Sequence, residues 1–412
     1  MRRERSSEEP ESRYEVLALF ASAMIAASLF VVSTGTLVPF IETALSLPSS
    51  QLGLVLSVQM IGSMLATAAS GALTDRFGDK AVVFWSGWLM GASLLMAAAV
   101  RDARWLFCWL ALYGIGYASV TPAGSHAIVY FFKKQDRGFA MGVRQCGVPV
   151  AGVIGSAILP IVAMRFDYQW ALVVAGIVTI AACSIAAMLY REPAALRGER
   201  VSLRAMFAEM VDISRDVRLV LMTLASMVLV SVQMVLLAFL TLTIVHEADL
   251  SIGIAVGLFT FSQICAVAGR VSWGIISDRL FGGRRAQPLA VVCVLTALLA
   301  YATSTISPGA PLWEVAAIAG ALGFAAEGWF GVAAIAFAEI GGEEHAGSAL
   351  GAALTWVFFA AFVAPTLFGA LVDTHGYAFA WRSLALLSIV GVVPALLAGV
   401  AMRRARVPVK AV

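Results

Sequence analysis

Charged residues are scarce in this chain. Only 13% of its 412 residues are Asp, Glu, Lys or Arg, whereas 61% are hydrophobic. Soluble domains are roughly half apolar and about a quarter charged. The shortage of charge therefore excludes an ordinary soluble domain and indicates a protein that lies in a lipid bilayer. The net charge of +3 says little about partners, and we expect no nucleic acid among them.

Groupings typical of metal sites, disulfides and enzymes are missing as well. The chain has only five cysteines and no C-x-x-C motif, so we predict neither a disulfide framework nor a metal site. A cluster of carboxylates, or a nucleophile with a base at a fixed spacing, is also missing, as is the Gly-rich loop that binds a nucleotide. We therefore expect no catalytic residues, no cofactor and no use of ATP.

Apolar stretches long enough to cross a bilayer recur along the whole chain. A transmembrane helix needs about 20 mostly apolar residues, and continuous runs of this length exclude the alternating pattern of a membrane β-barrel. We predict an all-α membrane protein with twelve transmembrane helices. The predicted spans are 16–40, 51–73, 81–100, 105–130, 139–163, 169–190, 218–245, 253–276, 287–306, 312–340, 347–372 and 380–401.

The basic residues are distributed unevenly between the two ends of these spans. If the N-terminus is inside, the inner segments carry most of the Lys and Arg residues, and the positive-inside rule then predicts that both termini are cytoplasmic. The outer segments hold only Arg101, Arg104, Arg165 and Arg382. Tryptophans at the outer ends of four spans predict an interfacial aromatic belt. They are Trp105, Trp170, Trp313 and Trp381.

Sequence features recur at about half the length of the chain. GALTDRFGDK at 71–80 is matched by GIISDRLFGGRR at 274–285, and Gly124 in the fourth span is matched by Gly331 in the tenth. A series of such pairs in the same order indicates an internal duplication. We predict two pseudo-symmetric six-helix bundles. The predicted segments are an N-tail (1–15), a first bundle (16–190), a cytoplasmic linker (191–217) with a short amphipathic helix at 202–212, a second bundle (218–402) and a C-tail (403–412).

The chain has six predicted spans, a basic linker and six more spans, and a G-x-x-x-D-R-x-G motif follows the second and the eighth span. This arrangement resembles the major facilitator superfamily of secondary transporters. The resemblance covers residues 16–402. It implies transport by alternating access and a functional monomer. Asp79 departs from the family pattern, which usually has a basic residue at that position.

The two copies of this motif are candidate gating elements. The residues concerned are Gly71, Asp75, Arg76, Gly78, Gly274, Asp278 and Arg279. In alternating access, two halves rock about a site near the membrane midplane. Glycines let helices approach closely, and each Asp can pair with an Arg or accept a hydrogen bond from a helix N-terminus in the other half. The alternative is a solvated loop pair worth well under 1 kcal/mol.

Charged residues deep within spans are the candidates for a substrate site, since each costs about 2.5 kcal/mol or more at the bilayer centre without a partner or a cavity. Arg270 lies about 12 Å and Arg144 about 10 Å from the inner ends of their spans. A guanidinium can hold a carboxylate through two parallel hydrogen bonds. We predict substrate binding by Arg270, Arg144 and the neighbouring Gln145; the alternative is that the arginines only brace the bundle. Arg270 also resembles the arginine of anion carriers in the superfamily, such as those for monocarboxylates.

Glu327, near the middle of the tenth span, is the candidate for proton coupling. Burial and a nearby arginine act on the protonation of a carboxylate in opposite directions, and a carboxylate balanced between them suits a proton-coupled carrier. We place Glu327 in the substrate site as well. The alternative is a structural ion pair with one of the two arginines.

The favoured function is thus a secondary active transporter of a small, carboxylate-like organic anion, working as a proton symporter or as an anion exchanger. Multidrug or metabolite efflux by proton antiport is the alternative, but the first, fourth and seventh spans lack the interior acidic residues that a carrier of cationic drugs needs. A receptor or a membrane enzyme is a third class. We expect a multi-pass protein of the bacterial cytoplasmic membrane, with the lipid bilayer, the substrate and a proton or counter-anion as partners.

Overall fold

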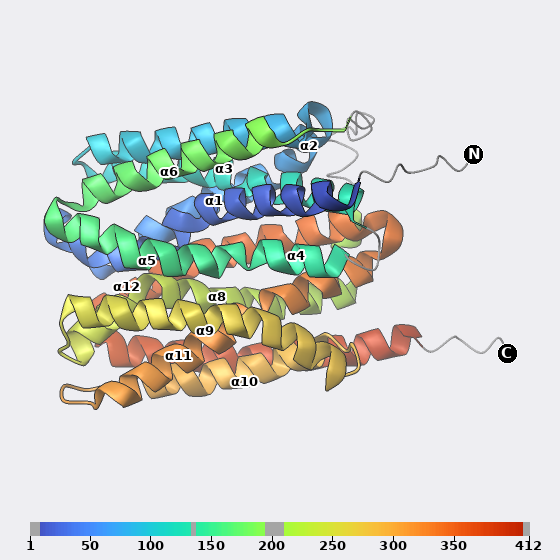
Figure 1. Ribbon diagram of the computed structural model, residues 1–412. Coiled ribbons are helices and arrows are strands. Elements are labelled where there is room, and N and C mark those ends of the chain that lie inside the picture. The colour runs from blue at the N-terminus through green and yellow to red at the C-terminus, as the bar shows by residue number, and fades with distance from the viewer. Residues whose placement is uncertain (1–8, 133–136, 194–209, 407–412) are drawn as a thin grey trace, which may run out of the picture.

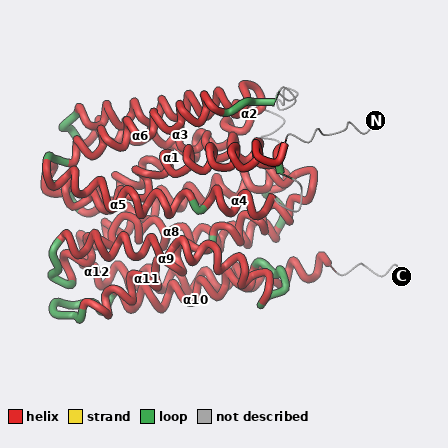
Figure 2. Tube along the Cα trace, in the orientation of Figure 1, coloured by secondary structure: helices red, strands yellow, loops and turns green. Residues whose placement is uncertain are grey.

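The chain folds into a bundle of long, roughly aligned helices. The computed structural model describes residues 9–132, 137–193 and 210–406, and every regular element in these ranges is a helix. Both termini lie at one end of the bundle (Figure 1), which we call the terminal end; the other is the opposite end. Short loops join the helices at both ends (Figure 2).

The helices form two halves. The first half contains α1 (Glu9–Leu45), α2 (Ser49–Ala99), α3 (Ala103–Phe131), α4 (Arg137–Gln145), α5 (Gly147–Arg165) and α6 (Tyr168–Leu189). The second half contains α8 (Val217–Glu247), α9 (Ile252–Arg279), α10 (Ala286–Thr303), α11 (Leu312–Gly328) and α12 (Phe330–Arg406).

Two of these helices contain more than one membrane span. Helix α2 changes direction at Gly78, which has φ 83° and ψ 162°, and α12 does so at Gly342 (φ 72°) and Gly376 (φ 82°). Glycine occupies these turns because a side chain is strained at positive φ. Sequence reasoning expected a break in the helix at each of these points, whereas the helical backbone continues on both sides of a single glycine.

The span count agrees with the prediction of twelve. Ten helical stretches among the described residues are long and apolar enough to cross a membrane. The last of them, Ser348–Arg404, has 57 residues and holds two spans that meet at Gly376. Helix α3, with 29 residues, supplies one more, so that ten, one and one make twelve.

Large apolar side chains cover the outside of the bundle. Trp85, Met188 and Leu298 are more than 60% exposed, and many other Leu, Ile, Val and Phe side chains on the helices are exposed as well. A soluble protein rarely exposes apolar surface on this scale. Lipid is the environment in which this surface is stable.

Short acidic caps begin three helices. Asp102 accepts a hydrogen bond of 2.7 Å from the Arg104 amide at the start of α3, and Asp167 accepts one of 3.0 Å from the Trp170 amide in α6. Asp216 accepts one of 2.8 Å from the Arg218 amide in α8. A carboxylate at this position satisfies an amide that has no partner within the helix and interacts favourably with the helix dipole.

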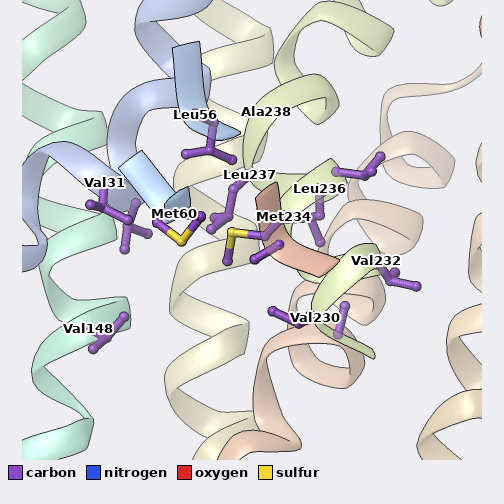
Figure 3. Packing of buried hydrophobic residues seen from close by; sticks show 14 of the residues in the cluster. Val31, Leu56, Met60, Val148, Val230, Val232, Met234, Leu236, Leu237 and Ala238 are labelled. Atoms are coloured by element: carbon purple, nitrogen blue, oxygen red, sulfur yellow. The ribbon is translucent and has the colours of Figure 1, made fainter. Parts of the chain in front are cut away.

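The two halves pack closely against each other between mid-bundle and the opposite end. A Cβ atom on Gly35 of α1 would lie 1.5 Å from the carbonyl oxygen of Leu237 in α8, and one on Gly53 of α2 would lie 2.4 Å from that of Pro365 in α12. Glycine therefore allows backbone contact between the halves. Figure 3 shows the apolar cluster at this boundary, with Met60 of α2 and Met234 of α8 among its members.

The predicted aromatic belt is only partly correct. Trp105, Trp170 and Trp313 are 60%, 54% and 73% exposed at the opposite end. Trp381, however, is completely buried, and its indole Nε1 donates a 3.0 Å hydrogen bond to the Thr243 hydroxyl. Most of the amphipathic segment expected at 202–212 lies outside the described residues, and the segment boundaries stay predictions.

Candidate functional site

The first element of the site is a missing hydrogen bond in the helical ladder beside Arg144 and Gln145. Helix α4 ends at Gln145 and α5 begins at Gly147. In a continuous helix, the Gln145 carbonyl would accept a hydrogen bond from the amide of residue 149. That residue is Pro149, which has no N–H. The Gln145 carbonyl is therefore available to another donor.

Arg270 of α9 supplies this donor from the other half. Its Nη1 atom donates a hydrogen bond of 3.3 Å to the carbonyl oxygen of Gln145. Its Nε atom is buried and has no hydrogen-bond partner among the described residues. The structure thus brings Arg270 and Gln145 together through the main chain of Gln145, and substrate binding by either residue stays a prediction.

Glu327 lies near the junction of two helices. Helix α11 ends at Gly328 and α12 begins at Phe330, so Glu327 is the last residue but one of α11. Its side chain is completely buried, and its Oε1 atom accepts a hydrogen bond of 2.6 Å from Nε2 of Gln263. Its charge also interacts with that of Arg270. Two of the three predicted charged residues therefore meet in one site.

Arg144 is completely buried within the first half. Its Nη2 atom donates a hydrogen bond of 2.9 Å to the Val120 carbonyl of α3. Its guanidinium lies against Gly124, where a Cβ atom would be 2.5 Å from Nε. The charge of Arg144 also interacts with that of Asp79. These contacts agree with the bracing role that was the alternative for this arginine.

Three buried polar atoms of the site have no hydrogen-bond partner among the described residues. They are Nε of Arg270, Oε2 of Glu327 and Oε1 of Gln263. Buried polar atoms in proteins are nearly always hydrogen-bonded, to protein or to water. This donor and these two acceptors are therefore candidates for hydrogen bonds to a ligand or to water.

Sequence reasoning missed Gln263 and Tyr117. Gln263 is completely buried and precedes Arg270 by seven residues, which places both on one face of α9; this spacing was the available signal. Tyr117 of α3 lies within electrostatic range of both Arg144 and Arg270. Nothing in its local sequence distinguishes it from an interfacial tyrosine.

The first candidate gating motif lies in the middle of α2, where this helix turns at the terminal end of the bundle. The backbone amide of Lys80 donates a hydrogen bond of 3.4 Å to Oε1 of Glu192, and a Cβ atom on Gly78 would lie 2.3 Å from the same oxygen. Glu192 therefore packs against the glycine turn. Arg76 is exposed, and its guanidinium lies 5.2 Å from the centre of the Phe77 ring. The surroundings of Gly71 and of the Asp75 side chain lie outside the described part.

The second candidate gating motif contacts its own half. Nη1 of Arg285 donates to Oδ1 of Asp278, and Nε of Arg285 donates to Oε1 of Glu339 at 3.3 Å. Arg279 is exposed, and a Cβ atom on Gly274 would meet nothing within 4 Å. Whether these residues exchange partners between states stays a prediction.

At the opposite end, α12 holds the start of α2. Asp373 accepts hydrogen bonds from the backbone amides of Ser49 (2.8 Å) and Ser50 (2.9 Å). Nearby, His246 of α8 lies 3.7 Å from the carboxylate of Glu42 in α1. Both contacts join the two halves. They tie the halves together at the opposite end, where Glu42 and His246 also line a pocket.

Relatives with similar sequences are transporters. An uncharacterised transporter of Mycobacterium tuberculosis is 26% identical over 371 residues, which are 90% of this chain and 82% of that protein. The 3-(3-hydroxyphenyl)propionate transporter of Escherichia coli is 26% identical over 243 residues, which are 58% of this chain and 59% of that protein.

A similar fold is known from a crystal structure. A bacterial homologue of the human lysosomal transporter Spinster superposes with a TM-score of 0.71 at 16% identity, over 97% of this chain and 98% of that one. At this identity the likeness shows the fold. The family model of the Major Facilitator Superfamily matches residues 18–365, which is well over half of the chain. The chain therefore belongs to the Major Facilitator Superfamily.

Proposed function

We propose that the chain transports a small organic anion across the membrane and that Arg270 binds the anion. The observation that carries this proposal is the buried, unpartnered Nε of Arg270 at the boundary between the halves. Nη1 is already held by the Gln145 carbonyl, so the edge formed by Nε and Nη2 is the one that can take a carboxylate through two parallel hydrogen bonds. The E. coli relative named above carries a carboxylate.

Glu327 offers a way to couple the anion to a proton. When the carboxylate of Glu327 is ionised, it offsets the charge of Arg270 and so weakens attraction for an anion. When it is protonated, Arg270 keeps its full charge, and the site gains a hydroxyl donor. A proton and an anion therefore favour each other's binding, which is the thermodynamic condition for symport. Anion exchange would use the same arginine without the proton.

The same proposal includes an orientation. The basic residues gather at the terminal end, which the positive-inside rule assigns to the cytoplasm. In that orientation, the contacts of Asp373 and His246 tie the halves together on the outer side. We propose a monomer in a bacterial cytoplasmic membrane, in which these contacts and those of the two charged motifs alternate during transport.

A ligand-stability screen tests the proposal. The purified protein is unfolded by heat with 3-(3-hydroxyphenyl)propionate, glucuronate, nitrate, a neutral sugar or a cationic dye, because a ligand that binds the native state raises the unfolding temperature. We expect stabilisation by an anion that disappears in Arg270→Ala and persists in Arg104→Ala, a change at an exposed arginine. Stabilisation by the dye that survives Arg270→Ala would replace anion transport with drug efflux.

A further inference from the structure

Helices α5 and α9 form a polar seam between the two halves. Oγ of Ser156 and Oγ1 of Thr260 share a hydrogen bond of 2.7 Å. Next along the helices, a Cβ atom on Gly152 would lie 2.5 Å from Oε1 of Gln263, so this amide packs directly on the glycine. The third contact is the hydrogen bond from Arg270 to the Gln145 carbonyl.

The third contact is made to a carbonyl that lacks its usual helical donor. A carbonyl already bonded within a helix is a weaker partner for an outside donor than one whose lone pairs are both available. The backbone at Cys146 stays helical, with φ −63° and ψ −18°, so an amide N–H at position 149 would point at the Gln145 oxygen. Pro149 has no such N–H. It leaves this carbonyl, the last of α4, open to Arg270.

The held atom determines which edge of the guanidinium is presented. The parallel N–H bonds of an arginine include the pair on Nε and Nη2, and Nη1 points away from that pair. With Nη1 fixed on the Gln145 carbonyl, the Nε–Nη2 edge is the pair of parallel donors that is left for a ligand. Nε of this edge has no hydrogen-bond partner among the described residues, and neither has Oε2 of Glu327 or Oε1 of Gln263.

We propose that Pro149 is a positioning residue, which orients Arg270 for anion binding by leaving the Gln145 carbonyl free to anchor Nη1. This inference rests on the proposed function, because the anion is taken to bind Arg270. Pro149 belongs to the first half of the protein, whereas Arg270, the anion-binding residue that it orients, belongs to the second half. Pro149 is then the cause of both the hydrogen bond between Arg270 and Gln145 and the orientation of the guanidinium edge that binds the anion.

Pro149→Ala restores the amide and is the direct test. The replacement N–H competes with Arg270 for the Gln145 oxygen, so we expect the Kd of the stabilising anion to rise roughly tenfold, as the loss of one charge-assisted hydrogen bond implies. The maximal transport rate should change much less. Pro394→Ala in α12 removes the same ring from another helix interior, and we expect it to leave the Kd unchanged.

A second measurement needs no anion. Ser156→Cys and Thr260→Cys place two thiols where the hydroxyls meet, and the rate of their disulfide formation in membranes, followed by peptide mass spectrometry, reports closure of the seam. Pro149→Ala should slow this rate several-fold. In a protein that already carries Arg270→Ala, the change Pro149→Ala should cause no further slowing, because the guanidinium that bonds to the Gln145 carbonyl is absent.

The two readouts separate the possible failures. An unchanged cross-linking rate in Pro149→Ala overturns the inference whether or not an anion binds. Slower cross-linking with an unchanged Kd also overturns it, because Pro149 would then affect only the seam. If Arg270→Ala leaves anion binding intact while Pro149→Ala slows cross-linking, the proposed function fails and the orienting role for binding fails with it.

Discussion

Gln263 donates a hydrogen bond of 2.6 Å to Glu327, and the two completely buried side chains come from neighbouring helices, α9 and α11. Gln263 also packs on Gly152 of the first half. The carboxylate that we assign to proton coupling is therefore linked through one amide to the boundary between the halves.

Removing this amide should impair transport. In Gln263→Leu, Oε1 of Glu327 loses its donor in a buried site, and the carboxylate is free to turn toward Arg270. We expect the uptake rate in proteoliposomes to fall about tenfold or more, because leaving a buried polar group unsatisfied costs roughly 1–3 kcal/mol. Gln287→Leu in α10 is the matched control. Equal rates in both variants would remove Gln263 from the site.

A variant that cannot bind the coupling proton should still exchange the anion across the membrane but should no longer accumulate it. Glu327→Gln keeps the size of the side chain but cannot ionise, so Arg270 retains its charge at every pH. We expect anion exchange between the two sides of a liposome to persist, whereas accumulation driven by a pH gradient is lost. Measured uptake with and without the gradient checks this. Undiminished accumulation would show that the proton is carried elsewhere.

Two glycines at matching positions of the repeat should respond differently to the same change. In Gly124→Ala the new methyl group meets the Arg144 guanidinium at 2.5 Å, whereas in Gly331→Ala it meets nothing within 4 Å. Overpacking of a buried site typically costs about 1–3 kcal/mol. We expect a clearly lower unfolding temperature in detergent for Gly124→Ala only. A similar loss in both variants would contradict the packing described for Arg144.

The Asp373 contact should control access at the opposite end. Asp373→Asn removes the charge that faces the two amides at the start of α2, and interactions of this kind are worth about 0.5–2 kcal/mol. We expect faster labelling of a cysteine placed at Thr366, deeper between α2 and α12. Asp249→Asn makes the same change at an exposed aspartate of that end and should leave labelling unchanged.

The cap of α8 should make a pH-dependent contribution to stability. Hydrogen bonds from the Arg218 side chain lower the pKa of Asp216. A group whose pKa is lower in the folded state than in the unfolded state stabilises the folded state at pH values above its unfolded-state pKa. This stabilisation disappears as the pH falls through the folded-state pKa. Asp216→Asn should therefore lower the unfolding temperature slightly at pH 7. The difference should shrink as the pH approaches 4 and below.

Much of the fold followed from the sequence because lipid imposes a simple rule. Twelve apolar runs and the burial of Arg144 and Glu327 all reflect the cost of polar groups in hydrocarbon. Trp381 shows the limit of this rule. An amphipathic ring near a span end suits the interface, but Thr243 offers its indole a buried partner, and only the packing of α8 against α12 decides between the two.

The site was predicted in part for a different physical reason. Arg270 and Glu327 were recognisable because a charge within a span needs a partner. The partner of Arg270 is a main-chain oxygen, and the sequence marks it only through a proline four residues later. The contact of Gln263 with Gly152 joins segments that are 111 residues apart, and neither segment carries a local sign of the other.

The apolar cluster around Met60, Met234 and Leu237 also has an electrical consequence (Figure 3). Its labelled members are all apolar (Figure 3), so part of the membrane voltage falls across a stretch of the boundary that these side chains fill. A unit charge that crosses 100 mV exchanges about 2.3 kcal/mol. An ion that crosses this part of the boundary therefore exchanges a share of that energy, and the voltage acts on that step.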